Sequence, residues 1–133
     1  MRGADFLDTN ILVYAATSHP DFACIADDLI TSGAVISVQV LNEFASVMSS
    51  KHRATWAEIR NFLEGARTLL TVIPLTPAAH VDALRLVERY RLQWWDALIA
   101  ASALEMGCDR LLTQDMHAGL VINGKLTVVN PFA

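Results

Sequence analysis

The sequence predicts a small α/β protein, a three-layer α/β/α sandwich around a mainly parallel central sheet. Three observations support this: short apolar runs alternate with helical patterns, the runs lack strict polar alternation, and 133 residues suit one domain. A hydrophobic content of 53% is enough to cover both faces of such a sheet. No repeat or linker interrupts the chain, so residues 1–133 are expected to form a single unit.

Four or five short strands are expected, because apolar runs are bounded by turn residues. The runs span residues 4–7, 34–38, about 70–73, 109–113 and 126–129. Ligand sites in parallel sheets form beyond the carboxyl ends of the strands, where the strand order reverses. Polar residues that follow a strand therefore indicate where a site would lie.

Helical patterns separate these strands, and most of them have a start signal. Pro20 is expected to open the first, and Ser37 is a candidate N-cap of the second. Thr55 has Glu58 three residues later, which is the spacing of a capping box, and Thr76 is a candidate cap of the next helix. The patterns span residues 20–33, 38–52, 55–70, 77–90 and 94–107.

The net charge of −4 and the isoelectric point near 5.4 argue against a protein that coats nucleic acid through charge alone. They leave open an enzyme that places divalent cations between its own carboxylates and a phosphate. No export signal and no run of roughly eighteen apolar residues is seen, so a cytoplasmic protein without membrane contact is expected. Cys24 and Cys108 are interpreted as reduced core thiols.

Two acidic residues stand at predicted strand ends. Asp8 lies between the apolar pair Phe6–Leu7 and the apolar run that begins at Ile11, and Asp115 follows the strand over 109–113. An ionised carboxylate in apolar surroundings is unfavourable unless it is paired, hydrated or bound to a cation. Each also has a structural interpretation, since Asp8 could cap a helix and Asp115 could begin a turn.

Two more acidic residues interrupt apolar helical faces. Glu43 shares a stripe with Val40 and Phe44, in the second turn after the second strand. Asp96 lies near the start of the almost wholly apolar segment "WWDALIAASALEM". Glu43 could instead sit at the edge of its helix face, and Asp96 could stabilise the helix dipole.

All four acids fall near strand ends or in the first turns of following helices, which favours a shared site. Carboxylates that converge on one crevice repel each other unless protons or cations intervene. Oxygen-only ligands suit Mg²⁺ or Mn²⁺, which also bind phosphate oxygens. Hydrolysis of a phosphodiester by one or two such ions is the chemistry that this arrangement favours.

Five segments resemble the PIN-domain ribonucleases, and most closely the VapC-type toxins of toxin–antitoxin pairs. They are "FLDTNILVY" at 6–14, "ISVQVLNEF" at 36–44, "WWDALIAASAL" at 94–104, "LLTQDMHAG" at 111–119 and "VVNPF" at 128–132. The segments occur in the family's order and span nearly the whole chain.

The resemblance implies a PIN-like fold and a Mg²⁺- or Mn²⁺-dependent endoribonuclease. It implies an RNA substrate, a VapB-like antitoxin as partner, and a homodimer. By position, the residues that resemble the family's metal-binding, catalytic acids are Asp8, Glu43, Asp96 and Asp115. The positions that match its supporting polar residues are Thr9, Asn10, Ser37 and Thr113. Asp5 is an extra carboxylate that should point to the opposite face of its strand.

Other interpretations differ in how well they fit. A phospho-acceptor receiver domain needs a lysine near a strand end, and neither Lys51 nor Lys125 is so placed. A housekeeping RNA-processing nuclease and an inactive PIN scaffold that only binds both stay open. The basic residues over 51–67 could contact RNA or an antitoxin. Trp94 and Trp95 flank the predicted site, and are interpreted as core or partner contacts, with base stacking as the alternative.

Overall fold

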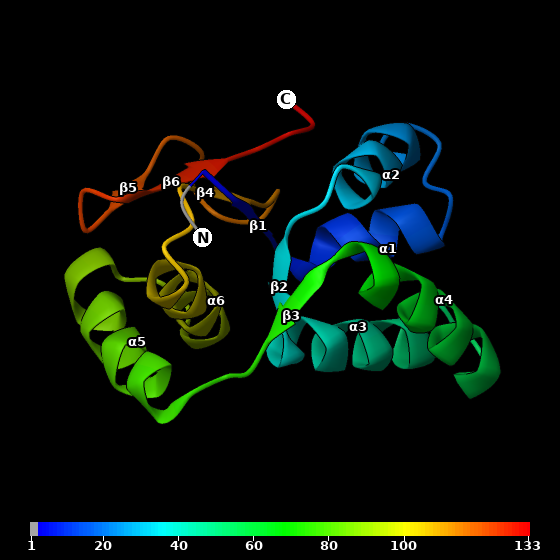
Figure 1. Ribbon diagram of the computed structural model, residues 1–133, viewed down its shortest axis with the longest axis horizontal. Helices are drawn as coiled ribbons and strands as arrows, with labels where there is room; N and C mark the ends of the chain where they lie inside the picture. The colour runs from blue at the N-terminus through cyan, green and yellow to red at the C-terminus, as the bar shows by residue number, and fades with distance from the viewer. Residues whose placement is uncertain (1–2) are drawn as a thin grey trace.

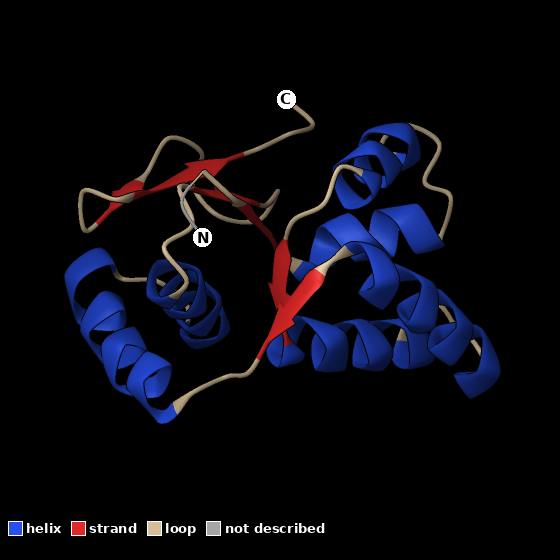
Figure 2. Ribbon diagram, viewed as in Figure 1, coloured by secondary structure: helices blue, strands red, loops and turns tan. Residues whose placement is uncertain are grey.

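The computed structural model describes residues 3–133 and contains one sheet with helices on both of its faces (Figures 1 and 2). The strand order is β3-β2-β1-β4-β6-β5, and only the β5–β6 pair is antiparallel. The three-layer α/β/α prediction is confirmed. The strands are β1 (Asp5–Leu7), β2 (Val35–Ser37), β3 (Thr71–Ile73), β4 (Arg110–Leu112), β5 (Val121–Ile122) and β6 (Leu126–Val129).

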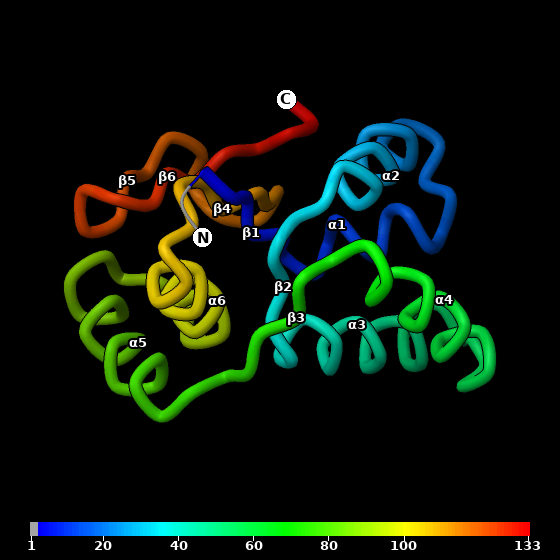
Figure 3. Tube along the Cα trace, viewed as in Figure 1, coloured from blue at the N-terminus to red at the C-terminus, as the bar shows by residue number. Residues whose placement is uncertain are grey.

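The helices form two layers. The first four gather on one side of the sheet, where α1 packs on α2 and α3, and α3 on α4 (Figure 1). On the other side α5 packs against α6, and Figure 3 shows how the loop after β3 carries the chain across to this second layer. The helices are α1 (Thr9–Ala16), α2 (Ala23–Thr31), α3 (Val38–Ser50), α4 (Trp56–Leu69), α5 (Pro77–Tyr90) and α6 (Trp94–Glu105).

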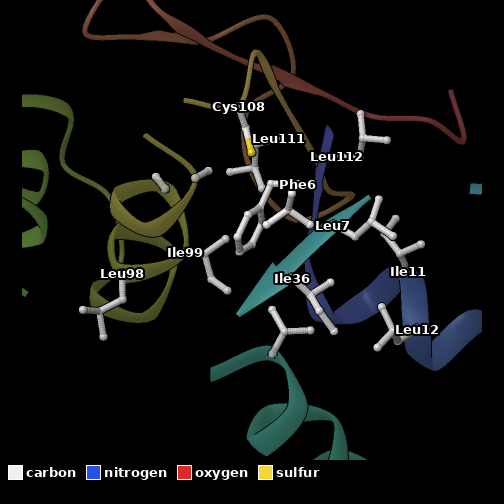
Figure 4. Close-up of a cluster of buried hydrophobic side chains, with 14 of the residues drawn as sticks. Phe6, Leu7, Ile11, Leu12, Ile36, Leu98, Ile99, Cys108, Leu111 and Leu112 are labelled. Atoms are coloured by element: carbon white, nitrogen blue, oxygen red, sulfur yellow. The ribbon is translucent and has the colours of Figure 1, made fainter. Parts of the chain in front are cut away.

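The core lies on both faces of the two central strands. Phe6 of β1 is fully buried and points toward Ile99 of α6, while Ile11 and Leu12 of α1 are fully buried in the opposite layer (Figure 4). Each such side chain contributes roughly 1.5–3 kcal/mol through burial. Helix α6 is buried over Ala97–Ala103, as expected of its uniformly apolar sequence. The core therefore fixes the ends of β1 and the start of α6 relative to each other.

The expected caps are present on three helices. Ser37 accepts a hydrogen bond from the N–H of Val40, and Thr76 accepts one from Ala79. Thr55 and Glu58 form the full capping box, each side chain accepting from the other residue's backbone N–H. These signals set where α3, α4 and α5 begin, because each satisfies an amide that lacks a helical partner.

Two predictions were wrong. Pro20 does not open a helix, since α2 begins at Ala23; the Phe22 ring just before it stacks on His19 and packs on Phe132, and this aromatic contact occupies the segment. Cys24 is exposed instead of lying in the core, whereas Cys108 is buried as expected, and both thiols are free.

The sequence analysis did not predict strand β5, which has only two residues. A turn signal in the sequence nevertheless indicates it. Asn123 and Gly124 both have positive φ, at 53° and 67°, between Ile122 and the start of β6. Asn-Gly is the sequence typical of a tight hairpin turn, in which both central residues need that backbone conformation. β5 is thus the first strand of a hairpin with β6, and it lies at the sheet edge, away from the central strands.

The strand order reverses between β1 and β4. From β1 the chain adds β2 and then β3 on one side, and after α5 and α6 it returns to place β4 on the other side of β1. The carboxyl ends of β1 and β4 therefore flank the switch point, where α/β sheets form their sites. No helix in residues 3–133 is long and apolar enough to cross a membrane.

Candidate functional site

Asp8 lies at the junction where β1 ends and α1 begins. It is the N-cap of α1, and its Oδ1 accepts from the N–H of Thr9 at 2.7 Å while its Oδ2 accepts from Oγ1 of Thr113 at 2.8 Å. Only 5% of the residue is exposed. Burial raises the pKa of Asp8 to about 7, the two hydrogen bonds lower it in part, and the charges of Asp96 and Glu43 raise it further.

The end of β4 contributes two further polar residues, Thr113 and Asp115. Thr113 is fully buried and its Oγ1, which donates to Asp8, accepts from Nδ2 of Asn10 at 3.3 Å and from the N–H of Asp115 at 3.1 Å. Asn10 also donates from Nδ2 to Oδ2 of Asp115 at 3.1 Å. Thr113 and Asn10 thus tie Asp8 and Asp115 into one network across the β1–β4 junction.

Helix α3 supplies Glu43. Its Oε1 accepts from Oγ1 of Thr9 at 2.7 Å, and its Oε2 accepts from Nε2 of Gln39 at 3.4 Å. Ser37 is fully buried and caps the helix that carries Glu43, so its hydroxyl positions the helix start. Asp8 and Thr9 are adjacent in sequence. The start of α1 therefore provides one acid of the site, Asp8, and the hydrogen-bond donor to a second acid, Glu43.

Asp96 lies in the first turn of α6 and comes from the opposite helical layer. It is half-buried, and burial raises its pKa, with further increases from the charges of Asp115 and Glu43. The four predicted acids, Asp8, Glu43, Asp96 and Asp115, all line one cavity of about 1030 Å³. Of the predicted supporting residues, Thr9 and Asn10 line this acid cavity, while Ser37 and Thr113 support it from behind.

The sequence analysis missed Gln39. It is 5% exposed, lines the acid cavity, and donates from Nε2 both to Glu43 and, at 3.0 Å, to the backbone carbonyl of Trp95. The spacing of four between Gln39 and Glu43 was a usable signal, because such a pair shares a helix face. The link to α6 was not readable, since it joins segments 56 residues apart.

No cation of the described residues pairs with the acids of this cavity. The ion pairs within residues 3–133 are Arg85–Asp82 and Arg110–Asp5, and neither involves the acid cavity. Lys51 lines the cavity but forms no ion pair in this described part of the chain. Asp5, as expected, does not line it.

The donor set consists of oxygens that suit a hard divalent cation. Carboxylates surround the cavity, and Oδ1 of Asn10 is a buried acceptor without a hydrogen-bond partner among the described atoms. Over residues 3–133 no three His, Cys, Asp or Glu side chains are arranged to hold one ion by themselves. Mg²⁺ does not need such a cage, because it keeps several waters and uses one or two carboxylates together with substrate phosphates. The residues present therefore fit a hydrated Mg²⁺ or Mn²⁺ ion.

The PIN domain family matches residues 6–118, which is most of the chain. The protein belongs to the PIN-domain family. The predicted recognition and the PIN fold are thereby confirmed. No curated protein sequence matches the chain.

Solved structures extend this PIN assignment. A toxin–antitoxin complex from Klebsiella pneumoniae has a TM-score of 0.71 at 21% identity, covering 96% of this chain and 98% of that chain. VapC20 of Mycobacterium tuberculosis, a toxin that cleaves the sarcin–ricin loop, has a TM-score of 0.68 at 17% identity over 81% and 87%. VapBC2 of Rickettsia felis, bound to promoter DNA, has a TM-score of 0.61 at 26% identity over 82% and 85%. The PIN domain described here thus has the fold of VapC toxins.

Proposed function

We propose that this PIN domain is a Mg²⁺- or Mn²⁺-dependent endoribonuclease that acts as the toxin of a toxin–antitoxin pair. One observation carries the proposal: acids from the β1 end, α3, α6 and the β4 end line a single cavity, and none of them is paired with a cation from residues 3–133. Mutual repulsion raises the pKa of Asp8 and Asp96, in addition to the effect of burial. A site that only stabilised the fold would be expected to neutralise these charges within the chain.

Asp8, Glu43, Asp96 and Asp115 would hold the metal. A divalent ion in such a site activates a water molecule and neutralises charge on a phosphate. In the proposed reaction the water oxygen bonds to phosphorus while the bond to the 3′ oxygen breaks. The products are a 5′ phosphate and a 3′ hydroxyl, and the ribose 2′ hydroxyl is not the nucleophile.

The neighbouring side chains hold the acids in place. Thr113 donates to Asp8, and Thr9 donates to Glu43, so each carboxylate keeps one lone pair engaged and a fixed orientation. Asn10 donates to Asp115, which is exposed and would otherwise be free to rotate. Such supporting hydrogen bonds orient ligands and raise their basicity. Lys51, at the far end of α3, is placed to contact a substrate phosphate.

An antitoxin partner, and assembly of two copies of this chain, are part of the same proposal. The structural neighbours from Klebsiella pneumoniae and Rickettsia felis are complexes of toxin and antitoxin. The chain also exposes large apolar side chains away from the acid cavity, among them Trp56, Val81 and Leu84. Exposed apolar surface of this kind is typical of partner contacts.

The test is RNA cleavage by the purified protein in the absence of any partner. We expect cleavage with Mg²⁺ or Mn²⁺, none with EDTA, and none by folded Asp96→Asn, with 5′-phosphate ends on the products. Asp82→Asn is the matched control, because Asp82 is an exposed aspartate on α5 that pairs with Arg85 outside the cavity. Cleavage that survives EDTA, or an active Asp96→Asn, would refute the proposal. Inactivity with every RNA and metal would favour the binding scaffold.

A further inference from the structure

One wall of the acid cavity is apolar and exposed. Val38 is 41% exposed, Leu75 39% and Trp95 54%, and the three come from α3, the β3–α5 loop and α6. Single exposed apolar residues are ordinary, but their convergence on one cavity, beside charged groups, marks a binding surface. Trp95 immediately precedes Asp96, and both line the cavity. The apolar wall is therefore next to the acids.

Helix α3 forms the floor of the cavity along its whole length. The residues that line the cavity include Val38, Gln39, Asn42, Glu43 and Ser46 of the helix, and Lys51, its C-cap. At 1.5 Å per residue, the first and last of these are roughly 20 Å apart along the helix axis. The surface changes character along this line, from apolar at the start of α3, through the acid Glu43, to the cation Lys51 near its end.

The aromatic wall is fixed relative to the acids. Gln39 donates from Nε2 to the carbonyl of Trp95 at 3.0 Å and to Oε2 of Glu43 at 3.4 Å. One buried amide therefore connects the start of α6 to the carboxylate on α3. This hydrogen bond fixes the backbone of Trp95, so its exposed side chain extends from a set position beside the acids.

We propose that Trp95, flanked by Val38 and Leu75, is the stacking platform for an unpaired RNA base adjacent to the cleaved phosphate. This inference rests on the proposed nuclease function and adds a residue that positions the substrate base. Stacking on aromatic side chains is how proteins hold splayed single-stranded bases, and it tolerates any base identity. A base inside a duplex has both faces covered by its neighbours, so it cannot use the platform. The phosphates on the far side of the acids then lie toward Lys51.

The first test compares two exposed tryptophans. In Trp95→Ala we expect KM for a single-stranded or loop RNA to rise about 10-fold or more, with kcat changed much less, and Trp95→Phe to retain most of the binding. Trp56→Ala is the control, because Trp56 is 66% exposed at the start of α4 and lies against Arg60 and Arg67 in a separate hollow. An abasic nucleotide next to the cleavage point should abolish the difference between wild type and Trp95→Ala.

A second readout does not depend on cleavage. The chain has three tryptophans, so the Trp56→Phe variant is used to lower the fluorescence that does not come from Trp95. The tryptophan fluorescence of this variant is followed while a short single-stranded RNA is added in EDTA or Ca²⁺. We expect quenching that disappears in Trp56→Phe/Trp95→Phe. Quenching without cleavage under any metal would support the platform while refuting the nuclease. Cleavage with unchanged KM in Trp95→Ala would refute the platform while leaving the nuclease intact.

Discussion

Strand β1 has an aspartate at each end, and the two carboxylates have opposite surroundings. Asp5, at its start, receives two hydrogen bonds from Arg110 at 2.7 and 2.8 Å, and this pairing raises the pKa of the guanidinium. Asp8, just past its end, is 5% exposed and receives only neutral donors. The chain supplies a cation where the carboxylate is structural. At Asp8 the part of the chain that the structure describes supplies none, although burial makes the charge more costly there.

The largest effect should separate these two aspartates in catalysis. Asp8→Asn should lower RNA cleavage at least about 100-fold, because loss of a ligand should exceed the 10- to 100-fold cost of losing a supporting hydrogen bond. Asp5→Asn should cleave within about twofold of wild type, since an exposed ion pair contributes at most about 1 kcal/mol. Initial rates on one RNA, with circular dichroism to confirm folding, measure both. Equal losses of cleavage in the two variants would mean that the aspartates at the two ends of β1 do not differ as described.

A smaller loss is expected when Asp8 keeps its charge but loses its orientation. Thr113→Val removes the donor to Asp8 and the acceptor for Asn10 and Asp115, and should reduce activity or metal affinity by about 10- to 100-fold. The matched control is Thr71→Val, an exposed threonine at the start of β3. If both variants behave alike in a metal titration, Thr113 has a role only in packing.

The contrast between Asp5 and Asp8 also predicts that Asp8→Asn gains stability over the wild type in a pH-dependent way. The pKa of Asp8 rises from 3.8 in the unfolded chain to about 7 in the fold, so both states are protonated only well below pH 3.8. Between these values only the unfolded chain releases its proton, and above pH 7 the native state has the full cost of a buried charge. Metal-free Asp8→Asn should therefore be more stable than wild type by up to about 4 kcal/mol at pH 8, and by less than about 1 kcal/mol at pH 4.

Urea denaturation in EDTA at the two pH values measures this difference. Asp5→Asn provides the contrast, because it removes a paired carboxylate and should show no gain at pH 8. A destabilised Asp8→Asn at pH 8 would mean that capping of α1 outweighs the burial of its charge.

The smallest effect isolates capping itself. Thr55 caps α4 as Asp8 caps α1, but with a neutral hydroxyl on an exposed helix end. Thr55→Ala should lower the free energy of unfolding by about 1 kcal/mol at pH 8 and by less at pH 4, because the hydrogen bonds with Thr55 lower the pKa of Glu58, and it should leave RNA cleavage unchanged. Thermal melts at pH 4 and pH 8 suffice. A loss that is larger at pH 4 than at pH 8 would contradict this account of the capping box.

The sequence predicted the layers of the fold and the acids because both are local signals. Apolar runs, caps at Ser37, Thr55 and Thr76, and acids at strand ends can be read without knowing the tertiary contacts. The role of Gln39 could not be predicted, because it depends on a carbonyl 56 residues away.

The predictions for Pro20 and Cys24 were wrong for a related reason. The Phe22 ring contacts Phe132 near the other end of the chain, and this long-range packing overrides the local helix signal of Pro20. Cys24 lies on the solvent side of α2, and apolar neighbours in sequence do not fix which face of a helix is buried.

The most direct measurement is calorimetric titration of Mn²⁺ into the metal-free protein, in parallel for wild type, Asp5→Asn and Asp8→Asn. The account predicts saturable binding with equal affinity in wild type and Asp5→Asn, and binding at least about 10-fold weaker in Asp8→Asn. Equal affinity in all three proteins, or no binding to the wild type, would contradict the claim that the cation missing beside Asp8 is a divalent metal.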